Sequence, residues 1–279
     1  MMFNHNNEVS MRKKKVVKIE NPVVQDVVDK FDTIYTMTKS FVQNKQSALR
    51  GLLISGDAGT GKTHAVQRAF IDTKTTHRAR IIKAGSITAA ALYVELYLNR
   101  HKGNVMVLDD CDIIHKAPAE KNTILDMLKG ATELTKGART ISWARASANQ
   151  LMREHEVPNT FDFQGTIIWI TNDKIDTIAK KAAAHWNAIS SRFTEITVYL
   201  TPQEKLLYTL HLIENGQMLG KNCMAKDEGY PLQVQANAVK YIKDNYKTLK
   251  EITPRIAIKI ADIMDNHPKT WKTLLNNQR

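Results

Sequence analysis

The sequence predicts a three-layer αβα domain with a mainly parallel sheet, followed by a small all-helical domain. Short apolar runs bounded by turn residues alternate with segments of helical periodicity over the first 200 of the 279 residues. No strand pattern follows residue 200, and only helical patterns continue from there. A hydrophobic content of 43% is sufficient for a buried core in a globular protein.

The α/β part is predicted from five strand patterns and four helix patterns. The strands are apolar runs suited to burial on both faces of a sheet, at residues 51–55, 79–84, 104–110, 165–172 and 195–200. The helices show apolar residues at helical spacing, at residues 23–42 (one helix or two), 62–71, 88–100 and 119–134. Their alternation indicates crossover connections between parallel strands.

The carboxyl-terminal part begins with a helix-start signal. Thr201 is the expected cap, Pro202 takes the first helical position and Glu204 lies in the first turn. Two more helical patterns cover residues 232–246 and 253–267. We therefore predict three parts: a basic tail at residues 1–20, an α/β domain at 21–200 and a helical domain at 201–279.

The formal charge of +12 leans toward the first hundred residues, which hold 16 Lys and Arg against 8 Asp and Glu. The only dense run, Arg12 to Lys15, is interpreted as a solvated tail, with nucleic acid as a possible partner. The chain shows no apolar region of a secretory signal and no apolar run long enough to span a bilayer. Two cysteines without zinc-type spacing indicate a reducing compartment, so we expect a cytoplasmic protein without membrane partners.

A phosphate-binding loop is predicted at residues 56–63, where GDAGTGKT follows an apolar strand and precedes a helix. Its glycines allow backbone N–H groups to face phosphates at a helix N-terminus. Lys62 is expected to reach the β- and γ-phosphates, and the Thr63 hydroxyl to ligate Mg²⁺. The predicted nucleotide-binding residues of this loop are Gly56, Asp57, Ala58, Gly59, Thr60, Gly61, Lys62, Thr63 and His64.

A carboxylate pair ends the third predicted strand, in VMVLDD at residues 105–110. The carboxyl ends of strands in open α/β sheets are where ligands bind. Asp109 is expected in the Mg²⁺ shell, and Asp110 as the general base that polarises the attacking water. Cys111, which follows, is expected to be a buried small side chain.

With these two motifs the chain resembles the AAA+ ATPases over most of residues 21–265, and is similar to those encoded by bacteriophages. The resemblance implies that Asn172 is the polar sensor residue at the end of a strand. It also implies that Arg192 is an arginine finger for a neighbouring subunit and that Arg255 is the nucleotide-binding arginine of the helical lid. A guanidinium suits both roles because it stays charged and offers paired donors.

The resemblance implies an enzyme that binds and hydrolyses ATP with Mg²⁺ at the subunit interfaces of a ring homo-oligomer, with a hexamer expected. It would remodel or load a macromolecule, with DNA metabolism as the expected setting. A slow-turnover binding switch or loader and a protein-remodelling chaperone stay open as alternatives, and a small-molecule kinase is disfavoured. Asp110 stands where the family usually has Glu, and residues 85–93 have no aromatic side chain at the expected pore-loop tip, since Tyr93 is expected in a helix core.

The segment at residues 136–165 is longer than a simple connection between elements. In ring-shaped relatives this stretch faces the central channel. Arg139, Trp143 and Arg145 would there offer charge and a stacking surface to a nucleic-acid strand. A structural hairpin is the equally weighted alternative.

Overall fold

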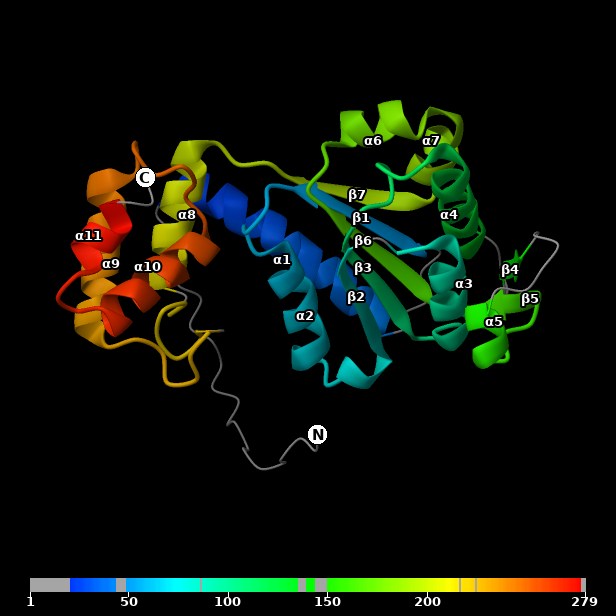
Figure 1. Ribbon diagram of the computed structural model, residues 1–279, viewed down its shortest axis with the longest axis horizontal. Helices are drawn as coiled ribbons and strands as arrows, with labels where there is room; N and C mark the ends of the chain where they lie inside the picture. The colour runs from blue at the N-terminus through cyan, green and yellow to red at the C-terminus, as the bar shows by residue number, and fades with distance from the viewer. Residues whose placement is uncertain are drawn as a thin grey trace.

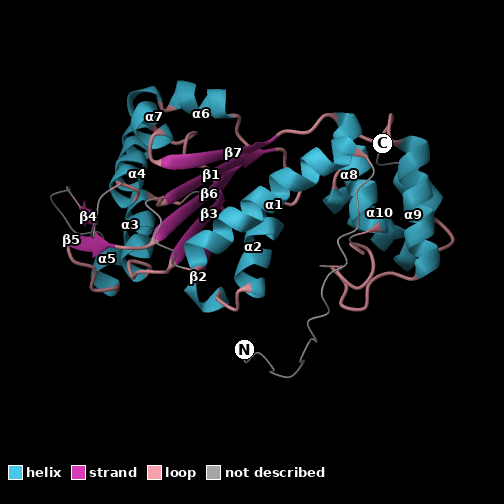
Figure 2. Cartoon of the chain, turned by 180° about the vertical axis from the view of Figure 1, so that it is seen from behind, coloured by secondary structure: helices cyan, strands magenta, loops and turns pink. Residues whose placement is uncertain are grey.

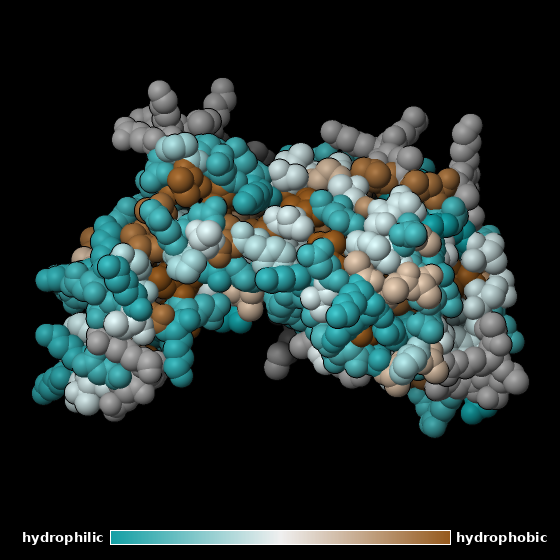
Figure 3. Space-filling model, turned by 90° about the horizontal axis from the view of Figure 1, so that it is seen from above, coloured by the Kyte–Doolittle hydropathy of each residue, from teal (hydrophilic) through white to brown (hydrophobic). Residues whose placement is uncertain are grey.

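The computed structural model describes residues 21–43, 49–85, 87–134, 139–143, 150–215, 217–223 and 225–276. An α/β lobe and a helical lobe lie side by side, joined by α1 and by the chain that leaves β7 (Figure 1). Seen from above, the two lobes are separated by a recess below a narrower waist (Figure 3). Among the described residues, no helix is long and apolar enough to cross a membrane.

The α/β lobe is built on a five-stranded parallel sheet with the order β2-β3-β6-β1-β7. Its strands are β1 (Gly51–Gly56), β2 (Ala79–Gly85), β3 (Val105–Cys111), β6 (Thr166–Thr171) and β7 (Phe193–Val198). Every residue of β1 and β6 is buried, as expected for central strands covered on both faces. The five strand predictions are confirmed, with boundaries shifted by up to two residues.

Helices cover both faces of this sheet, which gives three layers (Figures 1 and 2). One face packs against α1 (Pro22–Val42) and α2 (Lys62–Asp72). The other packs against α3 (Ala89–Leu98), α4 (Pro118–Ala131), α6 (Ile175–Lys181) and α7 (Ala183–Ser190). A short 3-10 helix, η1 (Thr76–Arg78), precedes β2. The predicted αβα architecture is confirmed, and residues 22–42 form one continuous helix.

The helical lobe contains α8 (Pro202–Glu214), α9 (Leu232–Asn245), α10 (Pro254–Asn266) and α11 (Trp271–Asn276) around a core of its own. Helix α8 begins with the predicted capping box, in which Thr201 and Glu204 bond each other's backbone N–H groups. The Phe31 ring of α1 stacks on the Tyr208 ring of α8 with centroids 4.8 Å apart. The boundary at residue 200 stays a prediction, consistent with all described strands preceding it.

In the long segment between β3 and β6, two of the three side chains expected to contact nucleic acid have a structural role instead. Strands β4 (Arg139–Ser142) and β5 (Thr160–Phe163) form an antiparallel hairpin that carries α5 (Gln150–Glu154). Arg139 is only 3% exposed and donates to the Phe163 and Gly165 carbonyls, and Trp143 is buried against Tyr93. Neither side chain faces solvent, so the expectation that they contact nucleic acid is wrong. Arg145 lies outside the described residues.

Two smaller expectations concern buried side chains. Tyr93 is fully buried, and its hydroxyl donates to the Pro158 carbonyl. This confirms the prediction that Tyr93 lies on the buried face of a helix. Cys111 is buried as predicted, and burial raises the pKa of its thiol to about 11. The thiol is therefore protonated and unreactive at neutral pH.

Candidate nucleotide-binding site

The loop between β1 and α2 has the backbone shape that the GDAGTGKT motif requires. Gly59 and Gly61 have φ angles of 70° and 111°, in the region that only glycine adopts without strain. Gly61 is the N-cap of α2 and supplies no side-chain acceptor, so the first-turn N–H groups stay available. Thr60 is buried and donates to the Asp57 carbonyl, which holds the loop closed on itself. His64 is exposed in the first turn of α2.

Lys62 lies at the centre of the site with 5% of its surface exposed. Its ammonium group donates to the Gly56 and Asp57 carbonyls, both at 2.8 Å, and to Asn172 Oδ1 at 2.9 Å. Burial lowers the pKa of Lys62 to about 8, although the carboxylates of Asp110 and Asp109 act in the opposite direction. A buried cation that is held by neutral carbonyls is well prepared to receive an anion.

Thr63 and Asp109 bring two oxygen ligands together, because Thr63 Oγ1 donates to Asp109 Oδ1 at 2.8 Å. Burial is the main cause that raises the pKa of Asp109, and the Thr63 bond acts against it. Hydroxyl and carboxylate oxygens are the ligands that Mg²⁺ prefers, and the cation usually keeps waters and substrate oxygens for its other positions. The pair therefore fits a Mg²⁺ ion that is shared with a bound phosphate.

Asn172 and Asp110 meet above the ends of neighbouring strands. Asn172 Nδ2 donates to Asp110 Oδ1 at 2.8 Å, while Asn172 Oδ1 accepts from Lys62. Asp110 is exposed and has a φ of 53°, a left-handed conformation that Asp tolerates better than most residues. The structure thus joins three of the predicted residues by hydrogen bonds into one polar group.

The helical lobe touches the phosphate-binding loop at two places. A Cβ atom placed on Gly59 would lie 3.1 Å from Thr253 Oγ1 and 3.5 Å from Arg255 Cβ, so α10 begins against the loop. The Arg255 side chain is exposed, and its charge is one of the causes that lower the pKa of Lys62. The start of α10 therefore brings Arg255 to the phosphate-binding loop.

The second contact is made by Asp57. Its carboxylate accepts from the Leu200 N–H at 3.0 Å and pairs with Lys205 of α8, also at 3.0 Å. Burial raises the pKa of Asp57, but these two donors outweigh it, so the pKa lies below its usual value. Asp57 also borders a cavity of about 490 Å³ beside the loop, which is lined in addition by Lys174, Ile175, Asp176, Thr197, Tyr199 and Leu200.

Of the predicted site residues, Arg192 is the one that lies away from the phosphate-binding loop in the structure. It immediately precedes β7, at the amino edge of the sheet, whereas the phosphate-binding loop follows the carboxyl end of β1. Its guanidinium pairs with Glu133 and donates to the Ala188 carbonyl at 2.8 Å. Within one subunit Arg192 therefore faces away from Lys62.

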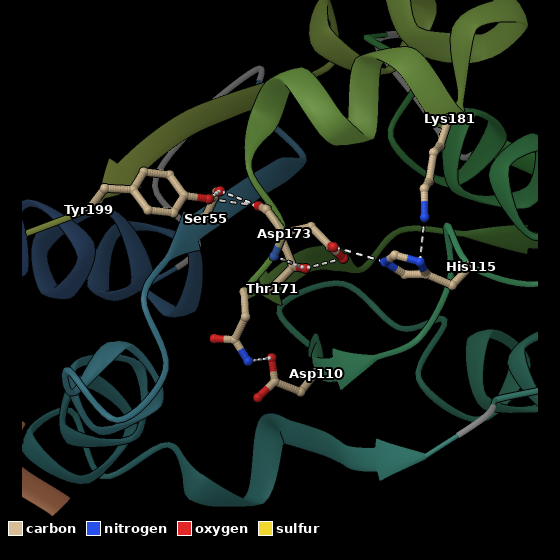
Figure 4. Close-up of polar contacts among 8 residues, drawn as sticks. Ser55, Asp110, His115, Thr171, Asp173, Lys181 and Tyr199 are labelled. Atoms are coloured by element: carbon tan, nitrogen blue, oxygen red, sulfur yellow. Dashed lines mark hydrogen bonds and ion pairs between the residues drawn. The ribbon is translucent and has the colours of Figure 1, made fainter. Parts of the chain in front are cut away.

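Sequence reasoning missed the polar residues beside Asn172. Asp173 bonds His115 and, through its backbone carbonyl, Ser55 and Tyr199, while His115 also contacts Lys181 (Figure 4). These residues follow no motif, and their side chains come from four separate segments. No spacing in the sequence could have indicated their proximity.

A comparison with known proteins agrees with the predicted similarity to bacteriophage proteins. No protein-family model matches the chain. The chain is 26% identical over 257 residues to the "Uncharacterized 36.7 kDa protein in nrdC-mobD intergenic region" of Enterobacteria phage T4, covering 88% of this chain and 72% of that protein. That relative is itself uncharacterized, so it carries no activity over to this chain.

Two solved structures are similar in outline. NtrX from Brucella abortus in complex with ATP is 12% identical with a TM-score of 0.46, over 89% of this chain and 51% of that chain. The RuvB Holliday junction branch migration motor of Thermotoga maritima is 13% identical with a TM-score of 0.47, over 89% and 63%. This chain thus spans about half to two thirds of those proteins. The fold of the chain itself, a parallel αβα sheet followed by a helical lobe, is the fold that the predicted resemblance implies.

Proposed function

We propose that this chain is an AAA+ ATPase that binds ATP with Mg²⁺ between its two lobes and hydrolyses it in a ring homo-oligomer. One observation carries the proposal: Lys62, Asn172 and Asp110 form one hydrogen-bonded group at the phosphate-binding loop. Hydrolysis of a γ-phosphate needs positive charge at the phosphate and groups that orient and activate the attacking water, and these three side chains offer both at one place. A glycine-rich loop without a nucleotide-binding role would not be expected to bring these three side chains together.

Each residue has a role that follows from its position. The loop N–H groups and Lys62 bind the phosphates, and Thr63 and Asp109 hold the metal. A bound Mg²⁺ supplies charge neutralisation at the phosphate oxygens. Asp110 accepts a proton from the attacking water, and the Asn172 amide orients that water. Lys62 and Asp110 both bond Asn172, so binding of phosphate and water by these groups would require the two bonds to exchange partners.

Arg192 is proposed to complete the site of a neighbouring subunit. Its place at the opposite edge of the sheet from its own phosphate-binding loop supports a role in trans. Arg255 is proposed to contact the nucleotide from the lid, because α10 starts against Gly59. The number of subunits, six by family resemblance, remains a proposal.

Steady-state ATP hydrolysis by the full chain tests this function. The wild type should release phosphate from ATP only with Mg²⁺, Lys62→Ala should lose nucleotide binding, and Asp110→Asn should bind ATP but turn over at least about 100-fold more slowly. A wild type that binds no ATP, or an Asp110→Asn variant with unchanged turnover, would refute the assignment.

A slow-turnover switch or loader is the second candidate. It is favoured by Asp110, whose carboxylate is one methylene shorter than the glutamate usual in the family and is already bonded to Asn172. Turnover well below one per minute, with and without DNA, would favour the switch. Turnover of several per second under either condition would favour the motor. A protein-remodelling chaperone stays a third candidate.

Nucleic acid is the proposed partner, because basic residues gather at the amino edge of the sheet. The loops at residues 73–78 and 99–104, before β2 and β3, hold four Lys or Arg and two His but no Asp or Glu. Arg78 Nη1 lies 3.3 Å from the Cβ position of Gly103, so the two loops form one surface. Such a surface suits a phosphodiester backbone without sequence preference.

Binding of a fluorescent DNA at several salt concentrations tests this partner. Arg78→Glu with Lys102→Glu should weaken binding and reduce the slope of log K against log salt by about 2. Lys240→Glu with Lys259→Glu changes the charge equally on exposed lid positions and serves as the matched control. Equal losses in both double variants would refute this surface as the binding site.

A further inference from the structure

Asp173, the residue after Asn172, is fixed at three points. Its backbone carbonyl accepts from Ser55 Oγ at 2.6 Å and Tyr199 OH at 2.7 Å. Its N–H donates to Thr171 Oγ1 at 3.1 Å, and its carboxylate accepts from His115 Nε2 at 2.8 Å (Figure 4). Both the backbone path and the side chain of Asp173 are thereby set. The direction in which the chain presents Asn172 depends on these bonds.

His115 is held from both sides. Its Nδ1 lies 2.6 Å from Lys181 Nζ, and its Nε2 faces Asp173. Because an ammonium group can only donate, Nδ1 must be the acceptor, and the imidazole carries its proton on Nε2. Lys181 belongs to α6, and its carbonyl accepts from Lys121 of α4 at 2.7 Å. The imidazole thus has one orientation and one tautomer that satisfy both neighbours.

The carboxyl ends of β3 and β6, with the loops that follow them, are therefore joined by two side-chain bonds. The first tie is the bond between Asn172 and Asp110, and the second is the bond between Asp173 and His115, both at 2.8 Å. The first tie uses groups that the proposed ATP hydrolysis needs, so binding of phosphate and water would open it. The second tie uses none of them and can stay closed throughout. The second tie can therefore extend the register set by the β3–β6 pairing, which ends at Asp109 and Ile170, while the first tie exchanges its partners.

We infer that His115 is a positioning residue, which acts through Asp173 to keep Asn172 aligned with Asp110 while Asn172 exchanges its partners. The inference rests on the proposed ATPase function. Small misplacements of reacting groups reduce rates strongly while they leave binding nearly unchanged. His115 should therefore affect turnover and leave nucleotide affinity alone.

Substitution of His115 separates positioning from general structure. His115→Ala should lower kcat by about 10- to 100-fold and leave the Kd for ATP within about twofold. His115→Gln should restore most of the rate, because its Nε2 can donate to Asp173 while its Oε1 accepts from Lys181. His267→Ala, at the exposed C-cap of α10, is the matched control and should behave as wild type. An unchanged kcat in His115→Ala, or equal losses in His115→Ala and His115→Gln, overturns the inference.

A second measurement does not depend on hydrolysis. Amide hydrogen exchange of the Asp173 N–H in nucleotide-free protein should accelerate at least about tenfold in His115→Ala and stay near the wild-type rate in His115→Gln. Unchanged protection in His115→Ala overturns the inference even if the wild type hydrolyses no ATP. A wild type without ATPase activity but with the expected exchange pattern refutes the proposed function and leaves the positioning contact standing.

Discussion

The pairing of Arg192 with Glu133 allows a direct test of whether Arg192 serves catalysis or only stability. Two arginine nitrogens bond one Glu133 oxygen, and the side chains are 23% and 43% exposed. Arg192→Ala removes the guanidinium, whereas Glu133→Gln keeps it and removes only the charge of its partner. A structural ion pair responds similarly to both changes, but an arginine finger does not.

The losses expected for a structural ion pair and for an arginine finger differ by orders of magnitude. An ion pair as exposed as this one contributes about 0.2–1 kcal/mol to stability, so either variant should lose no more than that in unfolding free energy. An arginine finger contributes about 10³- to 10⁵-fold to kcat. Arg192→Ala should therefore lose most of the activity. Glu133→Gln should keep it, or gain up to about fivefold, because Arg192 no longer has to leave a charged partner.

The assay measures kcat for both variants together with their unfolding in urea. Mixed oligomers add a test of action in trans, since Arg192→Ala and Lys62→Ala subunits each retain the half-site that the other lacks. Some activity should return when the two inactive proteins are mixed. Equal loss of kcat in Arg192→Ala and Glu133→Gln would refute the finger role, and co-assembly without recovered activity would refute action in trans.

Three further predictions concern the loop, the hairpin and the lid contact. Gly59→Ala should weaken ATP binding about 5- to 30-fold, because its φ of 70° strains any other residue and the new Cβ approaches Thr253. Gly130→Ala in α4, where an added Cβ meets open space, is the control in the same titration. Arg139→Met should lower the unfolding free energy in urea by about 2–4 kcal/mol, since two buried carbonyls lose their donor; no loss would show that these bonds are dispensable. Because the pKa of Asp57 in the folded protein is lower than its usual value of 3.8, the ionised carboxylate stabilises the fold fully at pH values above 3.8. This contribution is lost as the pH falls through the lower folded-state pKa. The unfolding free energy of the wild type should therefore fall more steeply below pH 4 than that of Asp57→Asn, and parallel curves would contradict a contribution from Asp57.

Local patterns in the sequence were sufficient to predict the α/β architecture and the backbone shape of the loop at residues 56–63. An apolar run followed by GDAGTGKT leaves the backbone few choices, because positive φ at Gly59 and Gly61 and a helix start at Lys62 are local requirements. The five buried strands were equally predictable from their apolar runs. The position of Asp109 at a strand end followed from the same reasoning.

Contacts between distant segments were decided only by the tertiary structure. From the sequence, a ligand contact and a structural role were equally expected for Arg139. Its burial follows from its pairing with Phe163 of β5, which lies 24 residues later in the chain. Nothing near Arg192 in the sequence indicates Glu133, and nothing near Asn172 indicates His115. A motif fixes the backbone of its own segment, but the partner of a long polar side chain depends on which segments the sheet order places beside it. In this protein the sequence determined the backbone of the loop at residues 56–63, and the packing of β3, β6 and α6 determined what holds Asn172 in place.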